Sequence, residues 1–211
     1  MKKVIILCLS LCLCLFTLTA CGEAKKVKKL TEQDIKTYTD QMKTEPLSGD
    51  ITLNGIKYSL PIKTQTLVAN GWKFNDYKDK GNPLENGYYV DLIHMDDGSK
   101  SEDSRIDVTI YNTSGSTVKF DDAMIGAIEI EKKGDSYQNT VVLPKGITLS
   151  STYEDILKAY GAPTFDSMKE MGWITYSASG IGKYGQELRI QFDKNTKVIT
   201  SIKLKNIPPK N

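Results

Sequence analysis

Apolar and polar residues alternate with a period of two over much of this chain, which is the pattern of β-strands. In one such segment Ile106, Val108 and Ile110 lie on one side, and Asp107 and Thr109 lie on the other. This pattern is typical of antiparallel strands that have one buried and one solvated face. Six strands are predicted in this way, at residues 88–95, 105–112, 124–131, 173–178, 187–193 and 197–205.

Three segments have helical periodicity instead. The clearest of them has Tyr153, Ile156, Leu157 and Tyr160 along one helical face. Ser151 and Glu154 stand at capping-box spacing at its start, and Gly161 ends it. Shorter or weaker helices are predicted at residues 31–42 and 62–70.

A similar order of elements occurs twice along the chain. The helix predicted at 62–70 is preceded by Asn54-Gly55-Ile56-Lys57 and ends at Gly71. The helix that contains Tyr153 and Tyr160 is preceded by Lys145-Gly146-Ile147-Thr148 and ends at Gly161. About three antiparallel strands follow each helix. A helix laid on one face of such a sheet buries the apolar sides of both. We therefore predict an α+β fold of two tandem repeats, each a helix packed on an antiparallel sheet.

The N-terminal segment is continuously apolar rather than alternating. Residues 4–18 carry no charge and follow Lys2 and Lys3. This is the pattern of a secretory signal peptide, because a spanning helix needs about 20 apolar residues. Leu18-Thr19-Ala20-Cys21 resembles the lipobox of bacterial lipoproteins. The resemblance implies cleavage between Ala20 and Cys21, a diacylglyceryl group on the Cys21 thiol, and a fatty acyl group such as palmitate on the new amino group.

These features define the expected organisation of the chain. The segments are a signal peptide at 1–20, a lipidated tether with a short helix at 21–49, and the two repeats at 50–135 and 136–211. Lysines follow the anchor at Lys25, Lys26, Lys28 and Lys29. They either form a solvated linker or attract anionic lipid headgroups by about 1 kcal/mol each. We expect the protein on the extracytoplasmic face of a membrane, held in the lipid by acylated Cys21.

Cysteine usage and charge exclude several classes of function. All four cysteines lie in the signal or at the lipidation point: Cys8, Cys12, Cys14 and Cys21. The exported domain therefore has neither a disulfide framework nor a thiol nucleophile. Cleavage also removes Lys2 and Lys3 from a chain of 28 basic and 26 acidic residues, so the formal charge becomes zero. A neutral domain is a poor partner for nucleic acid.

Residues 145–164 carry a further resemblance. They run from Gly146-Ile147-Thr148-Leu149 through a polar cap and an acidic first helical turn to Tyr160-Gly161-Ala162-Pro163. This stretch is similar to a signature of Firmicute envelope lipoproteins of uncharacterised role. It is more distantly similar to the SmpA/OmlA-type lipoproteins and the tandem-repeat β-lactamase-inhibitory proteins. The resemblance implies a helix-on-sheet fold and non-catalytic protein contact, although the inhibitory proteins rely on disulfides that this domain lacks.

The candidate chemical groups favour structural roles. His94 is the only histidine, and no nucleophile motif accompanies it, so it is interpreted as a surface imidazole. Residues 96–103 are rich in oxygen ligands but lack the spacing of a calcium loop. Residues 180–185 are glycine-rich but lie between strands, which indicates a hairpin. Asp121-Asp122 is interpreted as a turn. We predict no enzyme activity, no cofactor and no metal site.

Aromatic residues are the remaining functional signal, because rigid amphipathic aromatics are common at protein interfaces. The candidate interface residues are Trp72, Trp173, Tyr89, Tyr111 and Tyr176. The alternative interpretation of both tryptophans is packing in the core. The sequence thus predicts a lipid-anchored, non-catalytic module that contacts an envelope protein. The alternative is an extracytoplasmic receptor for a small ligand or peptide, bound in a cleft between the repeats.

Overall fold

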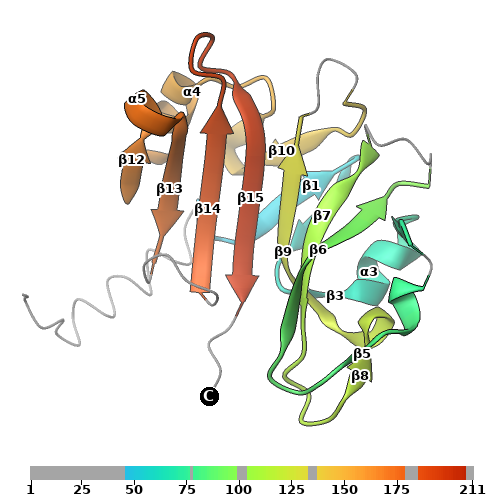
Figure 1. Ribbon diagram of the computed structural model, residues 1–211. Helices are drawn as coiled ribbons and strands as arrows, with labels where there is room; N and C mark the ends of the chain where they lie inside the picture. The colour runs from blue at the N-terminus through green and yellow to red at the C-terminus, as the bar shows by residue number, and fades with distance from the viewer. Residues whose placement is uncertain (1–45, 77, 99–103, 133–136, 179–184, 208–211) are drawn as a thin grey trace, which may run out of the picture. The chain divides into compact units, whose positions relative to one another are not determined.

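The computed structural model describes residues 46–76, 78–98, 104–132, 137–178 and 185–207 (Figure 1). The six long strands predicted from the alternation are confirmed, with small shifts at their ends. They are β6 (Tyr89–Asp96), β7 (Ile106–Tyr111), β9 (Met124–Glu131), β13 (Trp173–Ser177), β14 (Gly185–Phe192) and β15 (Ile199–Ile207).

These strands all belong to one nine-stranded sheet, called here the large sheet. Its order is β12-β13-β14-β15-β9-β7-β6-β4, and a further strand, β3, pairs with β9. The short members are β3 (Ile62–Lys63), β4 (Lys73–Phe74) and β12 (Phe165–Ser167). The pairing of β15 with β9 is antiparallel and sets Leu204 opposite Ile128. The edge strands β12 and β4 are both short, which limits pairing with other chains.

A second, four-stranded sheet has the order β11-β10-β1-β2 and is called here the small sheet. Its strands are β1 (Asp50–Leu53), β2 (Ile56–Ser59), β10 (Val141–Leu143) and β11 (Ile147–Thr148). Antiparallel pairing sets Thr52 of β1 opposite Val142 of β10. A separate ladder joins β5 (Pro83–Leu84) to β8 (Val118–Lys119). In the small sheet the Asn54-Gly55 turn joins β1 to β2, the turn at Pro144–Gly146 joins β10 to β11, and the two hairpins pair through β1 and β10.

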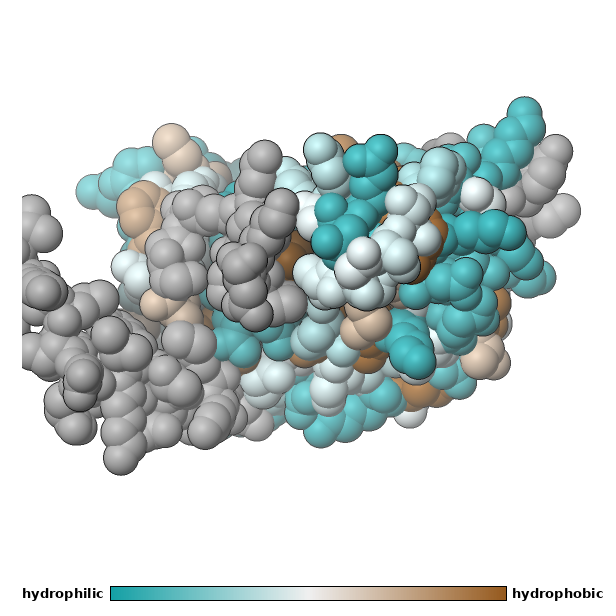
Figure 2. Space-filling model, turned by 90° about the horizontal axis from the view of Figure 1, so that it is seen from below, coloured by the Kyte–Doolittle hydropathy of each residue, from teal (hydrophilic) through white to brown (hydrophobic). Residues whose placement is uncertain are grey.

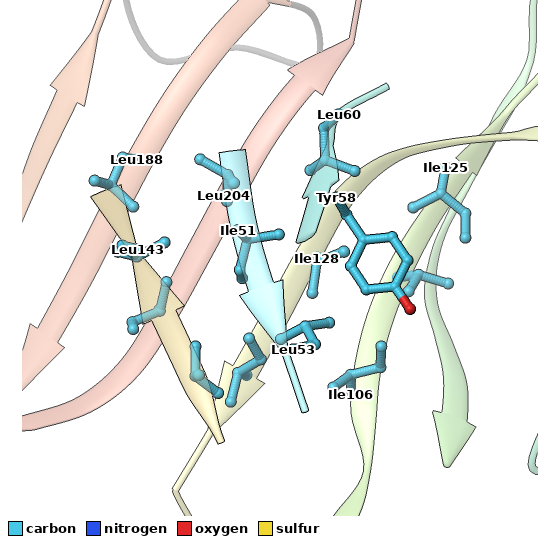
Figure 3. Packing of buried hydrophobic residues seen from close by; sticks show 14 of the residues in the cluster. Ile51, Leu53, Tyr58, Leu60, Ile106, Ile125, Ile128, Leu143, Leu188 and Leu204 are labelled. Atoms are coloured by element: carbon cyan, nitrogen blue, oxygen red, sulfur yellow. The ribbon is translucent and has the colours of Figure 1, made fainter. Parts of the chain in front are cut away.

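The hydrophobic core lies between the two sheets. Figure 3 shows side chains of the small sheet, among them Ile51, Leu53 and Leu143, gathered with Ile128, Leu188 and Leu204 of the large sheet. All six side chains are buried. Full burial of one such side chain contributes about 1.5–3 kcal/mol, so this layer is the main source of stability.

The helices are short. They are α3 (Thr64–Ala69), α4 (Tyr153–Tyr160) and α5 (Met168–Met171), accompanied by 3-10 turns η1 (Asp79–Gly81), η3 (Phe120–Asp122) and η5 (Pro144–Gly146). The capping box of α4 is formed by Thr152 and Asp155, one residue later than predicted. The Ser151 hydroxyl instead accepts the Thr148 backbone N–H at 3.1 Å. The predicted helix at 62–70 starts later, because Ile62–Lys63 pairs with β9.

The predicted fold of two helix-on-sheet repeats is wrong. The chain is mostly β-structure, and helices of 4–8 residues cover too little area to bury a sheet face. The small sheet takes that role. The strands expected in separate repeats also share both sheets, through the β1–β10 and β9–β15 pairings. Alternation identifies which residues of a strand are buried, but it carries no information about the strand's partner. Residues 21–45, which include most of the predicted tether and the helix predicted at 31–42, lie outside the described residues.

Candidate functional site

The face of the large sheet turned away from the core carries a row of polar side chains. Strand register aligns Asp107, Glu129, Lys203, Arg189 and Thr175 across five neighbouring strands, from β7 to β13. Lys203 Nζ lies 2.8 Å from Glu129 Oε2. These residues, called here the polar row, are the polar positions of the alternation found in the sequence, and four of the five are partly exposed, whereas Thr175 is buried.

Glu187 of β14 lies on the same face and forms ion pairs with two basic residues. One carboxylate oxygen lies 3.1 Å from Lys205 Nζ, and the other lies 3.2 Å from Arg189 Nη2. Glu187 is only 2% exposed and Lys205 only 8%. A buried carboxylate that contacts two cations holds both of them in place, because loss of either contact leaves charge uncompensated. The Arg189 guanidinium is therefore held in one orientation.

Arg189 belongs to a cluster of side chains at the β12–β13 edge of the large sheet. We call this cluster the aromatic corner, and its members are Phe165, Met171, Trp173 and Arg189. The rings of Phe165 and Trp173 stack, with centroids 4.9 Å apart and planes at 24°. Arg189 Cζ lies 5.2 Å from the Trp173 ring centroid, a cation–π contact. Trp173 Nε1 donates to Met171 Sδ at 3.3 Å. The corner thus joins apolar surface to an oriented guanidinium.

The exposure of this cluster distinguishes it from the rest of the described surface. On the face of the molecule in Figure 2, hydrophobic residues form small separate areas among hydrophilic ones. The large apolar residues that are exposed in the described ranges are Ile56, Tyr88, Leu92, Phe165 and Met171. Phe165 is 46% exposed and Met171 is 67% exposed, and both contact Trp173. A grouped apolar surface of this kind marks interaction sites more often than single exposed residues do.

The chain forms the corner through a tight reversal after α5. Gly172 has φ of 75°, in the left-handed region, and its N–H donates to Met168 O at 3.0 Å. This turn ends the helix and starts β13, so that Met171 lies beside Trp173. Glycine is favoured here because a Cβ is strained at positive φ.

Two buried polar atoms beside the corner lack hydrogen bonds within the part of the chain that the structure describes. They are Thr175 Oγ1 and Arg189 Nε. Thr175 stands opposite Arg189 in the strand register. A buried polar group without a partner costs about 1–3 kcal/mol, so these two atoms reduce the stability of this part of the sheet.

Only part of the sequence-predicted interface is accessible. Trp72, Tyr111 and Tyr176 are buried, so the prediction that they form an exposed surface is wrong. Tyr176 donates its hydroxyl to a backbone carbonyl at 2.7 Å, and burial raises its pKa to about 12. Tyr89 is partly exposed on β6, and Trp173 belongs to the aromatic corner.

Sequence reasoning missed three members of the corner. Arg189 was detectable, since the alternation of β14 already turns it to the solvated side. Phe165 and Met171 lie in short segments without a clear period, and only the β12–β13 pairing and the turn at Gly172 bring them to Trp173.

The other candidate groups have local roles. His94 Nδ1 lies 2.5 Å from Asp107 Oδ1, with the His94 side chain 40% exposed, as expected for a surface imidazole. The Asp96 carboxylate accepts the Gly98 N–H at 2.7 Å, which stabilises the turn after β6. Asp121-Asp122 lies in the 3-10 turn η3. Residues 99–103 and 179–184 are outside the described ranges, and within those ranges no group of three or more His, Cys, Asp or Glu can hold a metal ion.

An open cleft of about 600 Å³ lies beside α4 and α5 and is called here the α4–α5 cleft. Its lining includes Tyr153, Asp166, Lys169, Lys194 and Lys197. Tyr153 donates its hydroxyl to Asp166 Oδ2 at 2.6 Å, and this hydrogen bond raises the Tyr153 pKa to about 12. The cleft therefore combines a neutral tyrosine with carboxylate and ammonium groups.

No family model, curated protein or solved structure matches this chain. Cys21 and the rest of the predicted signal lie outside the described residues. Among the residues that are described, no helix is long and apolar enough to cross a membrane.

Proposed function

We propose that this protein is a lipid-anchored, extracytoplasmic, non-catalytic module that binds an envelope protein through the aromatic corner. The observation that carries the proposal is the grouping of exposed Phe165 and Met171 around Trp173, beside an arginine held by Glu187. Tryptophan and arginine are the residue types most enriched among binding hot spots.

The arrangement of the corner suits protein contact for a physical reason. Stacking and the Glu187 ion pair hold the Trp173 ring and the Arg189 guanidinium before a partner arrives. Pre-organised groups lose less conformational freedom on binding, and more of their contact energy then appears as affinity. A stable interface buries about 800 Å² on each partner, so contact extends from the corner over the neighbouring polar row. Charges there favour fast and specific association.

The anchor supplies the second part of the proposal. Acyl chains contribute about 0.8 kcal/mol per buried CH₂, and two chains give stable attachment to the bilayer. Attachment at Cys21 confines the domain to the membrane surface and raises its effective concentration near a membrane partner. Modest affinity at the corner is then sufficient for occupancy.

Site-specific photo-crosslinking in intact cells tests this proposal. A photoreactive residue at position 171 is expected to give one reproducible adduct with an envelope protein, and the same residue at position 56 is the matched control. Ile56 is also an exposed apolar residue, but it lies on the small sheet. Trp173→Ala should abolish the adduct and Cys21→Ala should reduce it. Equal adducts from both positions, or none from position 171, would contradict the proposal.

A second candidate function is a receptor for a small extracytoplasmic ligand, favoured by the α4–α5 cleft. Its volume of about 600 Å³ falls in the range of small-molecule sites, about 300–1,000 Å³. The cleft lies within residues 153–197 rather than between two repeats. A metabolite panel should raise the melting temperature of the wild type but not of Asp166→Asn, by linkage. A panel without any stabilising compound would argue against this candidate.

A further inference from the structure

One row of side chains on the outer face of the large sheet, the face turned away from the core, is buried although the row beside it is not. Strand register sets Glu187, Lys205, Ala127 and Thr109 side by side on β14, β15, β9 and β7. All four are at most 8% exposed. On the same strands the residues of the polar row are partly exposed, which is usual for the solvated face of an antiparallel sheet. We call the buried row the covered strip.

Apolar side chains extend the covered strip toward one end of the strands. Tyr111 of β7 and Ile207 of β15 are buried, and each is two residues after a member of the strip on its own strand, so both share its face. A Cβ on Gly126 of β9, the strand between them, would lie 2.5 Å from Ile207 Cγ1 and 2.8 Å from Tyr111 Cδ1. Both side chains therefore lie close against the sheet. With Ala127 they form an apolar group that is not part of the core cluster.

The described elements that flank the large sheet place their buried side chains on its opposite face. These side chains belong to the core cluster, among them Leu67 of α3, Ile156 of α4, Met168 of α5 and Leu84 of β5. Side chains on an open sheet face stay partly exposed, as those of the polar row do. The burial of the covered strip therefore points to a further segment of the chain on top of it.

The start of the described chain is close to one end of the strip. A Cβ on Gly49 would lie 3.5 Å from Asn206 Nδ2, and Asn206 is the residue before Ile207. Met42 is seven residues before Gly49. An extended chain of that length reaches about 23 Å. Residues 36–45 are therefore long enough to pass around the end of β15 to the outer face.

We propose that residues 36–45 bind across the covered strip of their own chain and act as a strap. Tyr38 and Met42 share one face of the helix predicted at 31–42, so both pack on the apolar group around Gly126. Ten helical residues span about 15 Å, which matches the width of four neighbouring strands about 4.8 Å apart.

Two other segments outside the described ranges are neighbours of the strip in sequence, and they fit it less well. Residues 208–211 are Pro-Pro-Lys-Asn and carry no large apolar side chain. Residues 179–184 join β13 to β14, whereas Tyr111 lies on β7, three strands from β14. The spacing of Tyr38 and Met42 favours the strap over both.

The strap has a consequence for the reach of the domain. Residues 36–45 stand between the predicted anchor at Cys21 and the first described strand, so docking shortens the free tether. Release of ten residues adds up to about 33 Å of extended chain. The strap also adjoins the polar row, over which we propose that the partner protein extends. This consequence rests on the proposed function, whereas the docking itself does not.

Cysteine labelling of the full-length protein in isolated membranes tests the docking. Ala127→Cys and Ala123→Cys replace alanines that are 1% and 2% exposed, the first on the covered strip and the second in the core. Maleimide should label neither quickly, and mass spectrometry of the labelled peptide excludes the native cysteines. With Tyr38→Asp and Met42→Asp added, labelling at position 127 should become about tenfold faster or more, because local undocking removes its protection. Labelling at position 123 should not change.

Thr37→Asp with Thr44→Asp is the matched control, since it adds the same two charges on the other side of the predicted helix. It should leave labelling at both positions unchanged, and a control as fast as the test variant would overturn the role of Tyr38 and Met42. Fast labelling at position 127 with the native segment, or equal acceleration at both positions, would overturn the docking. Protection that survives Tyr38→Asp and Met42→Asp would also overturn it, and its loss on deletion of residues 208–211 would then identify those residues as the occupant.

Discussion

Two Gly-Trp dipeptides in this chain have the same sequence and a similar backbone conformation at the glycine, but one tryptophan is buried and the other is partly exposed. Gly71-Trp72 follows α3 and Gly172-Trp173 follows α5, and both glycines have positive φ, 95° and 75°. Trp72 is 2% exposed and lies in the core, whereas Trp173 is partly exposed in the aromatic corner. The glycine determines where the helix ends. It does not determine which way the tryptophan faces.

The difference comes from the strands that follow. β13 lies inside the large sheet and buries Ile174 and Tyr176 against the core, so Trp173, one residue before Ile174, is turned to the opposite face. Trp72 comes just before the two-residue edge strand β4, and its N–H donates back to Leu67 O of α3 at 3.2 Å. This contact holds Trp72 under the helix. Strand position therefore buries one tryptophan in the core and leaves the other partly exposed, at the surface where we propose the protein contact.

The largest expected effect comes from truncating the two tryptophans. Trp72→Ala removes a buried side chain and should lower the free energy of unfolding by about 3–5 kcal/mol. Trp173→Ala should cost about 1 kcal/mol, since its ring is partly exposed. Urea denaturation followed by far-ultraviolet circular dichroism measures both. Equal losses would show that Trp173 is also a core residue.

Substituting the two glycines should give a smaller, unequal pair of effects. Alanine at either position is forced into the left-handed region, at about 1–2 kcal/mol. At Gly172 the new Cβ would also lie 3.0 Å from Phe192 O and 2.9 Å from Lys194 Cγ, whereas at Gly71 nothing lies within 4 Å. Gly172→Ala should therefore be the less stable variant in the same denaturation experiment. The reverse order would contradict the crowding seen at the end of α5.

The two longer helices, α3 and α4, also differ in how their N-termini are capped. Thr152 and Asp155 form a capping box at α4, whereas Lys63 at the start of α3 makes no side-chain cap. Thr152→Ala should cost about 1 kcal/mol, and Lys63→Ala should change little. Thermal unfolding of the two variants checks this. A larger loss for Lys63→Ala would mean that its strand pairing, not capping, limits the stability of α3.

The smallest expected effect is a pH dependence that only α4 should show. Hydrogen bonds from the Thr152 backbone N–H and side chain hold the pKa of Asp155 below the ordinary value of about 3.9. A carboxyl group with a lowered pKa stabilises the folded state above the unfolded pKa, and this stabilisation is lost as the pH falls through the folded pKa. The melting-temperature difference between wild type and Asp155→Asn should therefore be present at pH 6 and shrink below about pH 4. A difference that stays constant down to pH 2 would exclude this source of stability.

The sequence predicted the strands and one helix better than their assembly. Leu188, Ile190 and Phe192 alternate so regularly that β14 and its buried face follow from local pattern alone. No local pattern predicts that Leu204 stands opposite Ile128, because that pairing joins distant parts of the chain. The prediction of separate repeats was wrong for this reason.

Of the four residues in the aromatic corner, two could be predicted from the sequence and two could not. Trp173 was identified by residue type, and Arg189 could have been added from the alternation of its strand. Phe165 and Met171 reach the same surface only through a short edge strand and a four-residue helix, which leave too few positions for a period to be recognised. The burial of Trp72 likewise depends on contacts that local pattern does not report.

The position of β15 has a consequence for the newly made chain. It is the last strand along the described sequence, yet it stands between β14 and β9 and joins the two groups of strands into one sheet. A nascent chain that has not yet released residues 199–207 from the ribosome therefore has two unpaired strand edges, on β14 and β9, in the middle of the future sheet. Such a chain remains open to proteases and to aggregation until β15 inserts, so the large sheet is completed late in synthesis.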